Sequence, residues 1–339
     1  MRILVTGGTG YIGSHTVVEL MKVGHSVYIV DSLNNSSVEA LESIKQITGH
    51  RPEFTQGDIQ DQASIEHILS GHKIEGVIHF AAHKAVGESV AQPLKYYQNN
   101  VGGMVSLLKA VLACDIQNFV FSSSAAVYGN PPKPQATEET VYNPENPYGW
   151  SKCMDEIVLR DTCTANPDLK GIALRYFNVV GAHESGYMGE FGKLPPQNLL
   201  PIMLKAITTK TPLTVYGTDY PTPDGTCQRD YIHVVDLAKA HVAALNHITS
   251  GKQTGYDVFN VGTGKPTSVL EFINAFEKVN NVRVPHVLGE RRPGDPVSYY
   301  ASNEKAAKVL RWHATKTIED SVRDAWRWQQ YQDDKEESE

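Results

Sequence analysis

Residues 2–13 read RILVTGGTGYIG, a short apolar run followed at once by a turn that holds Gly7, Gly10 and Gly13. The run predicts a buried strand, and the residues after Gly10 predict a helix. Glycines in this context can make the turn, let the backbone approach a pyrophosphate, and let helix and strand pack closely. A glycine triplet alone would suit any tight turn, but the strand and the helix around it favour a dinucleotide-binding unit.

Further strand-like runs alternate with amphipathic stretches in the first half of the chain. The β-branched runs lie at residues 2–6, 26–31, 53–58, 76–81, 118–123 and 171–177. The stretches that read as helices begin near Gly10, Ser37, Asp61 and Gln92. Repeated strand–helix units predict an α/β fold with a doubly wound parallel sheet of the Rossmann type.

The composition and the strand–helix pattern of the sequence change after about residue 180. Residues 181–197 and 216–230 are rich in Gly, Pro and Asp and predict loops. Helical patterns follow at residues 198–208, 234–248, 268–279 and 321–331. We therefore expect a nucleotide-binding domain over residues 1–180 and a smaller, mixed α/β substrate-binding domain over residues 181–339. Some exchange of chain between the two domains is expected.

The overall composition excludes several classes of protein. The 339 residues are 41% hydrophobic and 20% charged, which is typical of a soluble protein with a substantial core. The net charge is −7 and no basic run occurs, which argues against nucleic acid or an anionic membrane as a partner. No signal peptide is visible, and no stretch approaches the roughly 20 apolar residues of a membrane span.

The metal-ligating residue types are scattered. The cysteines Cys114, Cys153, Cys163 and Cys227 show no metal-type pairing, and the 13 histidines form no motif such as HExxH. We expect reduced thiols in a cytoplasmic protein and no metal ion.

Acidic residues follow two of the predicted strands. Asp31 ends the second run, where a carboxylate can accept both ribose hydroxyls of an adenosine. It would repel a 2′-phosphate, so it favours NAD over NADP, although it could instead only cap the following loop. Asp58 follows the third run and is a candidate acceptor for the edge of an adenine.

A serine, a tyrosine and a lysine form the candidate catalytic group. Ser124 follows a strand, at the sheet edge where open parallel sheets bind ligands. Tyr148 and Lys152 lie one turn apart on the helix after Pro147. A free tyrosine has a pKa near ~10, but a neighbouring ammonium and the positive nicotinamide of NAD would favour its phenolate. The Tyr–Lys pair alone is common on exposed helices, yet beside a glycine turn and a strand-end serine it predicts a base.

Longer stretches resemble the extended short-chain dehydrogenase/reductase family. They are TGGTGYIGSH, HFAAHKAVGESV, SSSAAVYG, YGWSK, RYFNVVGAHESG and RDYIHVVDLA, and the resemblance runs from Met1 to about Trp328. It is strongest with the members that invert carbon 4 of a UDP-hexose. The resemblance implies a tightly held NAD, a UDP-sugar substrate bound by the second domain, and a homodimer.

The resemblance also implies roles by position. The cofactor residues it implies, besides the three glycines, are Tyr11, Ile12, Asp31, Asn35, Asp58, Ile59, Phe80, Ala81, Ala82, Lys84, Asn99, Ser124, Tyr148, Lys152 and Phe177. The UDP-sugar residues it implies are Ser124, Tyr148, Asn178, Asn198, Leu199, Tyr216, Arg229, Tyr231, Arg292, Asp295 and Tyr299. Two arginines suit a diphosphate because a guanidinium donates hydrogen bonds in pairs.

The implied activity is that of an isomerase that interconverts UDP-galactose and UDP-glucose. A 4-keto sugar would form while a hydride passes to NAD and back, with Tyr148 as acid and base. Ala125 and Ala126 stand where dehydratase relatives carry acidic residues, which disfavours elimination of water. A related epimerase of UDP-N-acetylhexosamines or UDP-uronates, and a non-catalytic NAD-binding regulator, stay open as alternatives. Tyr299 resembles the version of the family with the narrower sugar pocket.

The resemblance implies that the homodimer forms through two helical regions, residues 92–113 and 148–165, packed against their copies as a four-helix bundle. Trp150 lies in the second region and suggests packing at this subunit contact.

Overall fold

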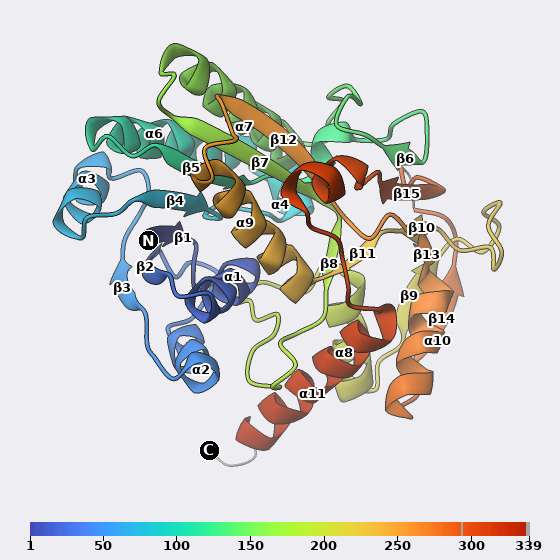
Figure 1. Cartoon of the computed structure of the whole chain (residues 1–339). Helices are drawn as coiled ribbons and strands as arrows, with labels where there is room; N and C mark the ends of the chain where they lie inside the picture. The colour runs from blue at the N-terminus through green and yellow to red at the C-terminus, as the bar shows by residue number, and fades with distance from the viewer. Residues whose placement is uncertain (293, 337–339) are drawn as a thin grey trace.

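The computed structural model of the chain describes residues 1–292 and 294–336. Its centre is a seven-stranded parallel sheet in the order β12-β7-β5-β4-β1-β2-β3 (Figure 1). The strands are β1 (Arg2–Thr6), β2 (Ser26–Asp31), β3 (Glu53–Gln56), β4 (Gly76–His79), β5 (Asn118–Ser122), β7 (Lys170–Tyr176) and β12 (Tyr256–Val261). This order confirms the predicted doubly wound sheet. It reverses between β1 and β4, and ligands bind at such a reversal, beyond the carboxyl ends of the strands.

Side chains of each strand alternate between two apolar cores. On β1, Ile3 and Val5 belong to one core and Leu4 to the other. The first core is covered by α1 (Tyr11–Lys22), α2 (Glu39–Thr48) and α9 (Val234–Thr249). The second is covered by α3 (Gln62–Gly71), α6 (Gly103–Ala113) and α7 (Pro147–Ala165). The near-continuous apolar runs of the sequence therefore reflect burial on both faces of the sheet.

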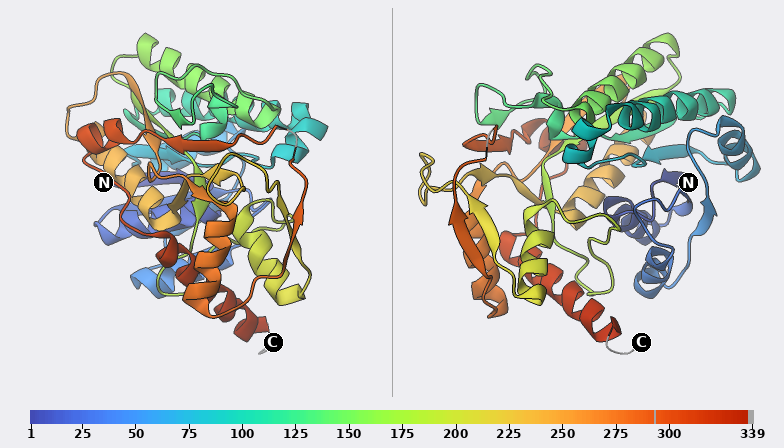
Figure 2. Two further views of the ribbon diagram at one scale, coloured as in Figure 1. Left: turned by 90° about the vertical axis from the view of Figure 1, so that its right-hand side faces the viewer. Right: turned by 180° about the vertical axis from the view of Figure 1, so that it is seen from behind.

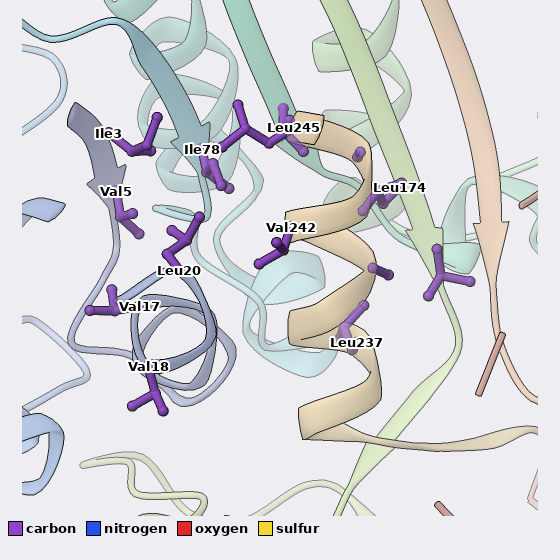
Figure 3. Close-up of a cluster of buried hydrophobic side chains, with 14 of the residues drawn as sticks. Ile3, Val5, Val17, Val18, Leu20, Ile78, Leu174, Leu237, Val242 and Leu245 are labelled. Atoms are coloured by element: carbon purple, nitrogen blue, oxygen red, sulfur yellow. The ribbon is translucent and has the colours of Figure 1, made fainter. Parts of the chain in front are cut away.

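Figure 3 shows part of the first core, where the sheet meets α1 and α9. Leu20 of α1 and Val242 of α9 lie near Ile78 of β4, and all three are buried. This packing holds α1 against the sheet and so fixes the position of the helix start that follows the glycine turn.

Short elements join these layers. The helices α4 (Val86–Ala91) and α5 (Pro93–Tyr96) lead through a π-helical stretch, Tyr97–Gly102, into α6. A 3-10 turn, Ala125–Tyr128, follows β5 directly.

The remaining elements gather to one side of the parallel sheet (Figure 2). A four-stranded sheet joins β6 (Gln135–Ala136), β10 (Gln228–Arg229), β13 (Thr267–Ser268) and β15 (Ser298–Ala301). Two strand pairs join β8 (Asn178–Val180) to β11 (Tyr231–His233) and β9 (Leu213–Tyr216) to β14 (His286–Gly289). The helices are α8 (Leu199–Thr209), α10 (Val269–Asn280), α11 (Ile318–Glu336) and a π-helical turn, Ala306–Leu310.

Segments are exchanged between the two halves of the chain. Strand β12 comes from the second half but pairs with β7 at the edge of the large sheet, and α9 packs on α1. Strand β6 comes from the first half but pairs with β15. The division near residue 180 stays a prediction. The sequence had not marked β12 as a strand.

The described residues contain neither a membrane-spanning helix nor a metal-binding cluster. Within residues 1–292 and 294–336, no helix is long and apolar enough to cross a membrane. The histidine, cysteine and acidic side chains of the same ranges form no group that could hold a metal ion.

Candidate active site

The glycine turn after β1 has a separate reason for each glycine. Gly7 has φ +71°, and a Cβ there would lie 2.7 Å from the nitrogen of Ala81. A Cβ on Gly13 would lie 2.2 Å from the carbonyl oxygen of Gly7, so this glycine lets α1 pack on the turn. Gly10 caps the start of α1 and lines the cleft described next. The first N–H groups of α1 therefore face a position suited to a phosphate.

A cleft with an empty volume of about 1040 Å³, open solvent included, lies at the carboxyl ends of the central strands. Most of the predicted cofactor residues line it: Gly7, Gly10, Tyr11, Ile12, Gly13, Asp31, Asn35, Asp58, Ile59, Phe80, Ala81, Ala82, Lys84, Asn99, Tyr148 and Lys152. Ser124 and Phe177 are not in its lining. Ser124 bonds to Tyr148 instead, and the ring of Phe177 lies 4.9 Å from the ring of Tyr299.

Sequence reasoning missed part of the lining. The additional residues are Val30, Ser32, Asn34, Ser36, Gly57, His83, Tyr176 and Phe191. Most of these flank a predicted residue at a strand end, so the strand-end rule would have found them if applied to whole loops. Phe191 is different, because it arrives from the irregular segment between β8 and α8 and no local pattern marked it.

Asp31 both organises the protein and lines the cleft. Its carboxylate accepts hydrogen bonds from Thr9 N at 3.1 Å, Leu33 N at 3.0 Å and Ser36 Oγ at 3.0 Å. A carboxylate has about four acceptor positions, so these bonds leave capacity for a ribose hydroxyl. The two interpretations of Asp31, loop cap and ribose acceptor, are therefore compatible. Asp58 likewise accepts from Gln60 N at 2.9 Å and lines the cleft.

The start of α7 positions the tyrosine and the lysine. Asn146 Oδ1 accepts from Gly149 N at 2.9 Å and Pro147 occupies the first helical position, a favourable helix start. Tyr148 comes directly after Pro147, and Lys152 lies one turn later. Tyr148 is only 8% exposed and Lys152 only 2%. Lys152 Nζ donates to Ser122 O at 2.8 Å and lies 4.7 Å from the centre of the Phe121 ring.

Ser124 completes this group. Its hydroxyl accepts a hydrogen bond from Ala126 N at 3.1 Å, which leaves its proton free. It is hydrogen-bonded to the phenol of Tyr148, and this bond lowers the Tyr148 pKa. The fold thus brings the three predicted catalytic residues together beside the cleft, although Ser124 follows β5 and the other two lie on α7.

The electrostatics differ from the expectation in one respect. Burial raises the pKa of Tyr148 above its usual value and outweighs the hydrogen bond from Ser124. Burial also lowers the pKa of Lys152 to about 8, against the carboxylates of Asp155 and Glu156, which raise it. The expected effect of the neighbouring lysine is not sufficient by itself, because burial dominates the pKa of Tyr148 in the side chains alone. A positive charge brought to the cleft by a ligand is needed to favour the phenolate.

A second group of predicted residues gathers away from the sheet edge. Arg229 Nη2 lies 3.2 Å from Asp295 Oδ1, and Arg292 Nε lies 3.9 Å from Asp295 Oδ2. The guanidinium of Arg292 also lies 4.6 Å from the centre of the Tyr216 ring. Two cations share one carboxylate here, so the group carries a net positive charge beside an aromatic face. This combination suits a diphosphate linked to a flat base.

The other predicted substrate residues are spread around this region. Tyr299 donates its hydroxyl to Ala125 O at 2.8 Å, next to the catalytic serine. Asn178 is exposed at the start of β8, and Asn198 and Leu199 begin α8. The ring of Tyr231 lies 4.7 Å from that of Phe272 in the core, so its side chain is engaged in packing. A substrate role for Tyr231 stays a prediction.

The doubly wound sheet carries a glycine turn before a helix, a strand-end aspartate and a Ser–Tyr–Lys group. Together these features define a nicotinamide-dependent enzyme of the Rossmann class. Residues 3–262 match the family model of the NAD dependent epimerase/dehydratase family. The chain belongs to this family.

Named relatives are similar over almost the whole chain. The UDP-glucose 4-epimerase of Haemophilus influenzae is 50% identical over 331 residues, 97% of each chain. A structure of UDP-glucose-4-epimerase from Stenotrophomonas maltophila with bound NAD and formylated UDP-arabinopyranose matches with a TM-score of 0.96 at 43% identity, over 99% of both chains. The enzyme from Bifidobacterium longum in complex with NAD+ and UDP matches with a TM-score of 0.91 at 47% identity, over 98% of both chains.

Proposed function

We propose that this chain is a UDP-glucose 4-epimerase, which interconverts UDP-galactose and UDP-glucose with NAD as a resident cofactor. The observation that carries the proposal is the buried phenol of Tyr148, bonded to Ser124 at one end of a cleft built for a dinucleotide. The proposal is supported by relatives named UDP-glucose 4-epimerase, from Haemophilus influenzae and Bacillus subtilis, which are 50% and 48% identical to this chain over 97% of their length.

The residues of the cleft fit NAD. The pyrophosphate would lie at the glycine turn and the start of α1, where Lys84 of the opposite wall could neutralise it. Asp31 would hold the adenosine ribose and oppose a 2′-phosphate. NAD, when bound, would supply a reversible acceptor for the hydride of carbon 4 of the sugar.

Residues of the chain itself remove and return the proton on the 4-oxygen of the sugar. Tyr148, as phenolate, takes the proton from the 4-hydroxyl and later returns it. Ser124 donates a hydrogen bond to the same oxygen and holds it at the phenol. Lys152 lies one turn away as an ammonium, which stabilises the phenolate charge.

The arginine pair explains how the ketone stays bound. Arg229 and Arg292 would grip the diphosphate, while the sugar is free to turn about its link to that diphosphate. The grip is remote from carbon 4, so the same contacts serve both faces of the sugar.

The sugar end of the site favours a hexose without an N-acetyl group. Tyr299 is fixed there by its bond to Ala125 O and by the ring of Phe177, and it would occupy space that an N-acetyl group needs. The test is to offer purified protein UDP-galactose, UDP-N-acetylgalactosamine and UDP-galacturonate separately and to separate the products. We expect conversion of UDP-galactose to be the fastest by at least about tenfold.

Other results would select an alternative. Turnover of the N-acetylated or uronate substrate alone would replace the proposed substrate. Bound NAD without turnover of any of the three would indicate a non-catalytic regulator.

We also propose a homodimer formed through α5, α6 and α7, with the short α4 beside them. Exposed apolar side chains gather on α4, α5 and α7: Val86, Val90, Leu94, Trp150, Met154 and Ile157. Trp150 is 44% exposed in the single chain, which supports a packing role between subunits. Sedimentation should give a dimer, and Trp150→Glu should give a monomer. A monomeric wild-type protein would contradict this arrangement.

A cytoplasmic location is part of the same proposal. The four cysteines are free, and three of them are buried as thiols. Free thiols are typical of a reducing compartment.

A further inference from the structure

The segment Glu190–Leu194, which we term the strap, lies against both sides of the cofactor cleft. It belongs to the irregular stretch between β8 and α8, the yellow-green loop between α1 and α8 in Figure 1. On the β4 side, Glu190 Oε1 lies 3.2 Å from Lys84 Nζ. On the β2 side, Lys193 Nζ donates to Leu33 O at 2.7 Å and Leu194 N donates to Asn35 Oδ1 at 3.1 Å.

On each side, the strap contacts a residue that lines the cofactor cleft. Lys84 and Asn35 both line the cavity, and so does Phe191 of the strap. Lys84 follows β4 and Asn35 follows β2, on either side of the glycine turn at the end of β1. The strap therefore crosses the half of the cleft that contains Asp31, which is where the adenosine of a dinucleotide would lie.

The strap has a fixed base and an exposed tip. Before it, Tyr11 donates its hydroxyl to Gly181 O at 2.6 Å and Met188 is buried. A Cβ on Gly189 would lie 2.2 Å from the Trp328 ring, so this residue is packed tightly against α11. Residues 191–195 are exposed, and Phe191 is 45% exposed. The tip can therefore lift once the contacts to Leu33, Asn35 and Lys84 break.

A second cavity lies on the other side of Phe191. It lies between α1, α2 and α11, with an empty volume of about 840 Å³, open solvent included, and Trp328 and Tyr331 are in its lining. Tyr11 and Phe191 line both cavities and so form a thin common wall. The ring of Phe191 has space on this side when the strap moves outward.

We propose that the strap retains NAD, with Phe191 as a side chain that covers the adenosine end and Lys193 as the residue that fastens the tip. A dinucleotide in the cleft would leave only when the tip lifts, so dissociation waits on the breakage of these contacts. The inference rests on NAD as the cofactor and not on the identity of the sugar.

The test measures NAD dissociation without substrate. Holoenzyme loaded with radiolabelled NAD is diluted into excess unlabelled NAD, and the retained label is followed by rapid gel filtration. We expect Lys193→Met and Phe191→Ala each to release the label about tenfold faster than wild type, the scale expected for loss of a single contact. Lys193→Arg keeps a cationic donor and should restore most of the retention. Lys252→Met, an exposed lysine after α9, is the matched control and should release the label as wild type does.

The outcomes separate the strap from the proposed function. Release at the wild-type rate from both strap variants, with conversion of UDP-galactose intact in wild type, would overturn the strap alone. An equal acceleration in Lys252→Met would overturn it as well, because the effect would not be local. A wild-type protein that binds no NAD would overturn the strap together with the proposed function.

Discussion

Lys152 of α7 donates a hydrogen bond to the carbonyl oxygen of Ser122 at 2.8 Å, and this bond ties the catalytic helix to the end of β5. Tyr148 lies one turn before Lys152, and Ser124 lies just after Ser122, so the bond holds the phenol beside the hydroxyl. An ammonium group has three N–H donors, and the remaining two can serve a ligand in the cleft. Lys152 and Ser122 are only 2% and 1% exposed, so the hydrogen bond between them is shielded from water.

Replacement of Tyr148 by phenylalanine removes the proton carrier and keeps the ring. We expect turnover of UDP-galactose to fall by about 10²–10⁴-fold, the usual contribution of general acid–base catalysis. The bound NAD, measured after denaturation, should stay at the wild-type level because the cleft keeps its other walls. A Tyr148→Phe protein with near-native turnover would show that another group moves the proton.

Asp155 lies one turn beyond Lys152 on α7 and is 1% exposed. Its Oδ1 has no hydrogen-bond partner within the described ranges, and burial raises its pKa to about 7. Its carboxylate raises the pKa of Lys152 and so opposes the burial that, on balance, brings this pKa down to about 8. Asp155→Asn should therefore let Lys152 lose its proton at lower pH, and the alkaline limb of kcat/KM should move to lower pH.

The control for this prediction is Asp161→Asn, an exposed aspartate on the same helix that pairs with Arg160 at 2.9 Å. It should leave the pH profile in place. Identical alkaline limbs for Asp155→Asn and wild type would show that Asp155 does not act on Lys152.

The buried histidines should make the folded protein less stable in acid. Burial lowers the pKa of His15 and His79 to about 3 and that of His241 to about 4, from an ordinary 6.5. The unfolded chain binds more protons than the folded one between pH 6.5 and about 4, so stability is lost as the pH falls through this window. The urea midpoint should be lower at pH 5 than at pH 7.5.

A variant isolates one of these histidines. His79 shares a 2.7 Å hydrogen bond with Thr6 Oγ1, and His79→Gln should give a shallower loss of stability between pH 7.5 and pH 5. The exposed His67→Gln should keep the wild-type slope. Equal slopes in all three proteins would count against the burial argument.

Arg292 offers a test of the diphosphate grip. Its side chain is 58% exposed, so Arg292→Met should fold normally while it removes one of the two cations. We expect KM for UDP-galactose to rise about tenfold, about 1.4 kcal/mol, with a smaller change in kcat. Arg291→Met is the matched control because Arg291 Nε pairs with Asp219 at 2.7 Å instead. Equal KM values for the two variants would argue against the assignment of Arg292.

Much of the sheet could be predicted because burial on both faces leaves a strong local pattern. The runs that became β1, β2 and β7 each contain three or four consecutive apolar residues. The start of α7 was also local, since Asn146 and Pro147 are typical of a helix start.

Strand β12 escaped prediction because long-range contacts define it. Its run, YDVFNV, carries Asp257 and Asn260, which do not suit a buried strand by composition. Asn260 is nevertheless buried, because it accepts a hydrogen bond from Tyr128 Oη at 2.7 Å and donates one to Ala136 O at 3.0 Å. No pattern within the strand reveals partners more than a hundred residues away.

The site residues also fall into two groups, those that local sequence patterns reveal and those that depend on long-range contacts. Tyr148, Lys152 and Asp31 occupy positions that a strand end or a helix turn makes recognisable. Phe191 and the direction of the Tyr148 pKa depend on how segments close over one another, and neither follows from spacing along the chain. The resemblance to a family supplied the arginine cluster, which local patterns do not single out.

In the proposed mechanism, a hydride leaves carbon 4 of the sugar and returns to the same carbon within one bound complex. The most direct measurement is to incubate the protein, without added NAD, with UDP-galactose that carries deuterium on carbon 4. In ordinary water, we expect UDP-glucose in which the deuterium is still on carbon 4. Absence of UDP-glucose, or UDP-glucose in which solvent hydrogen has replaced the deuterium, would contradict it.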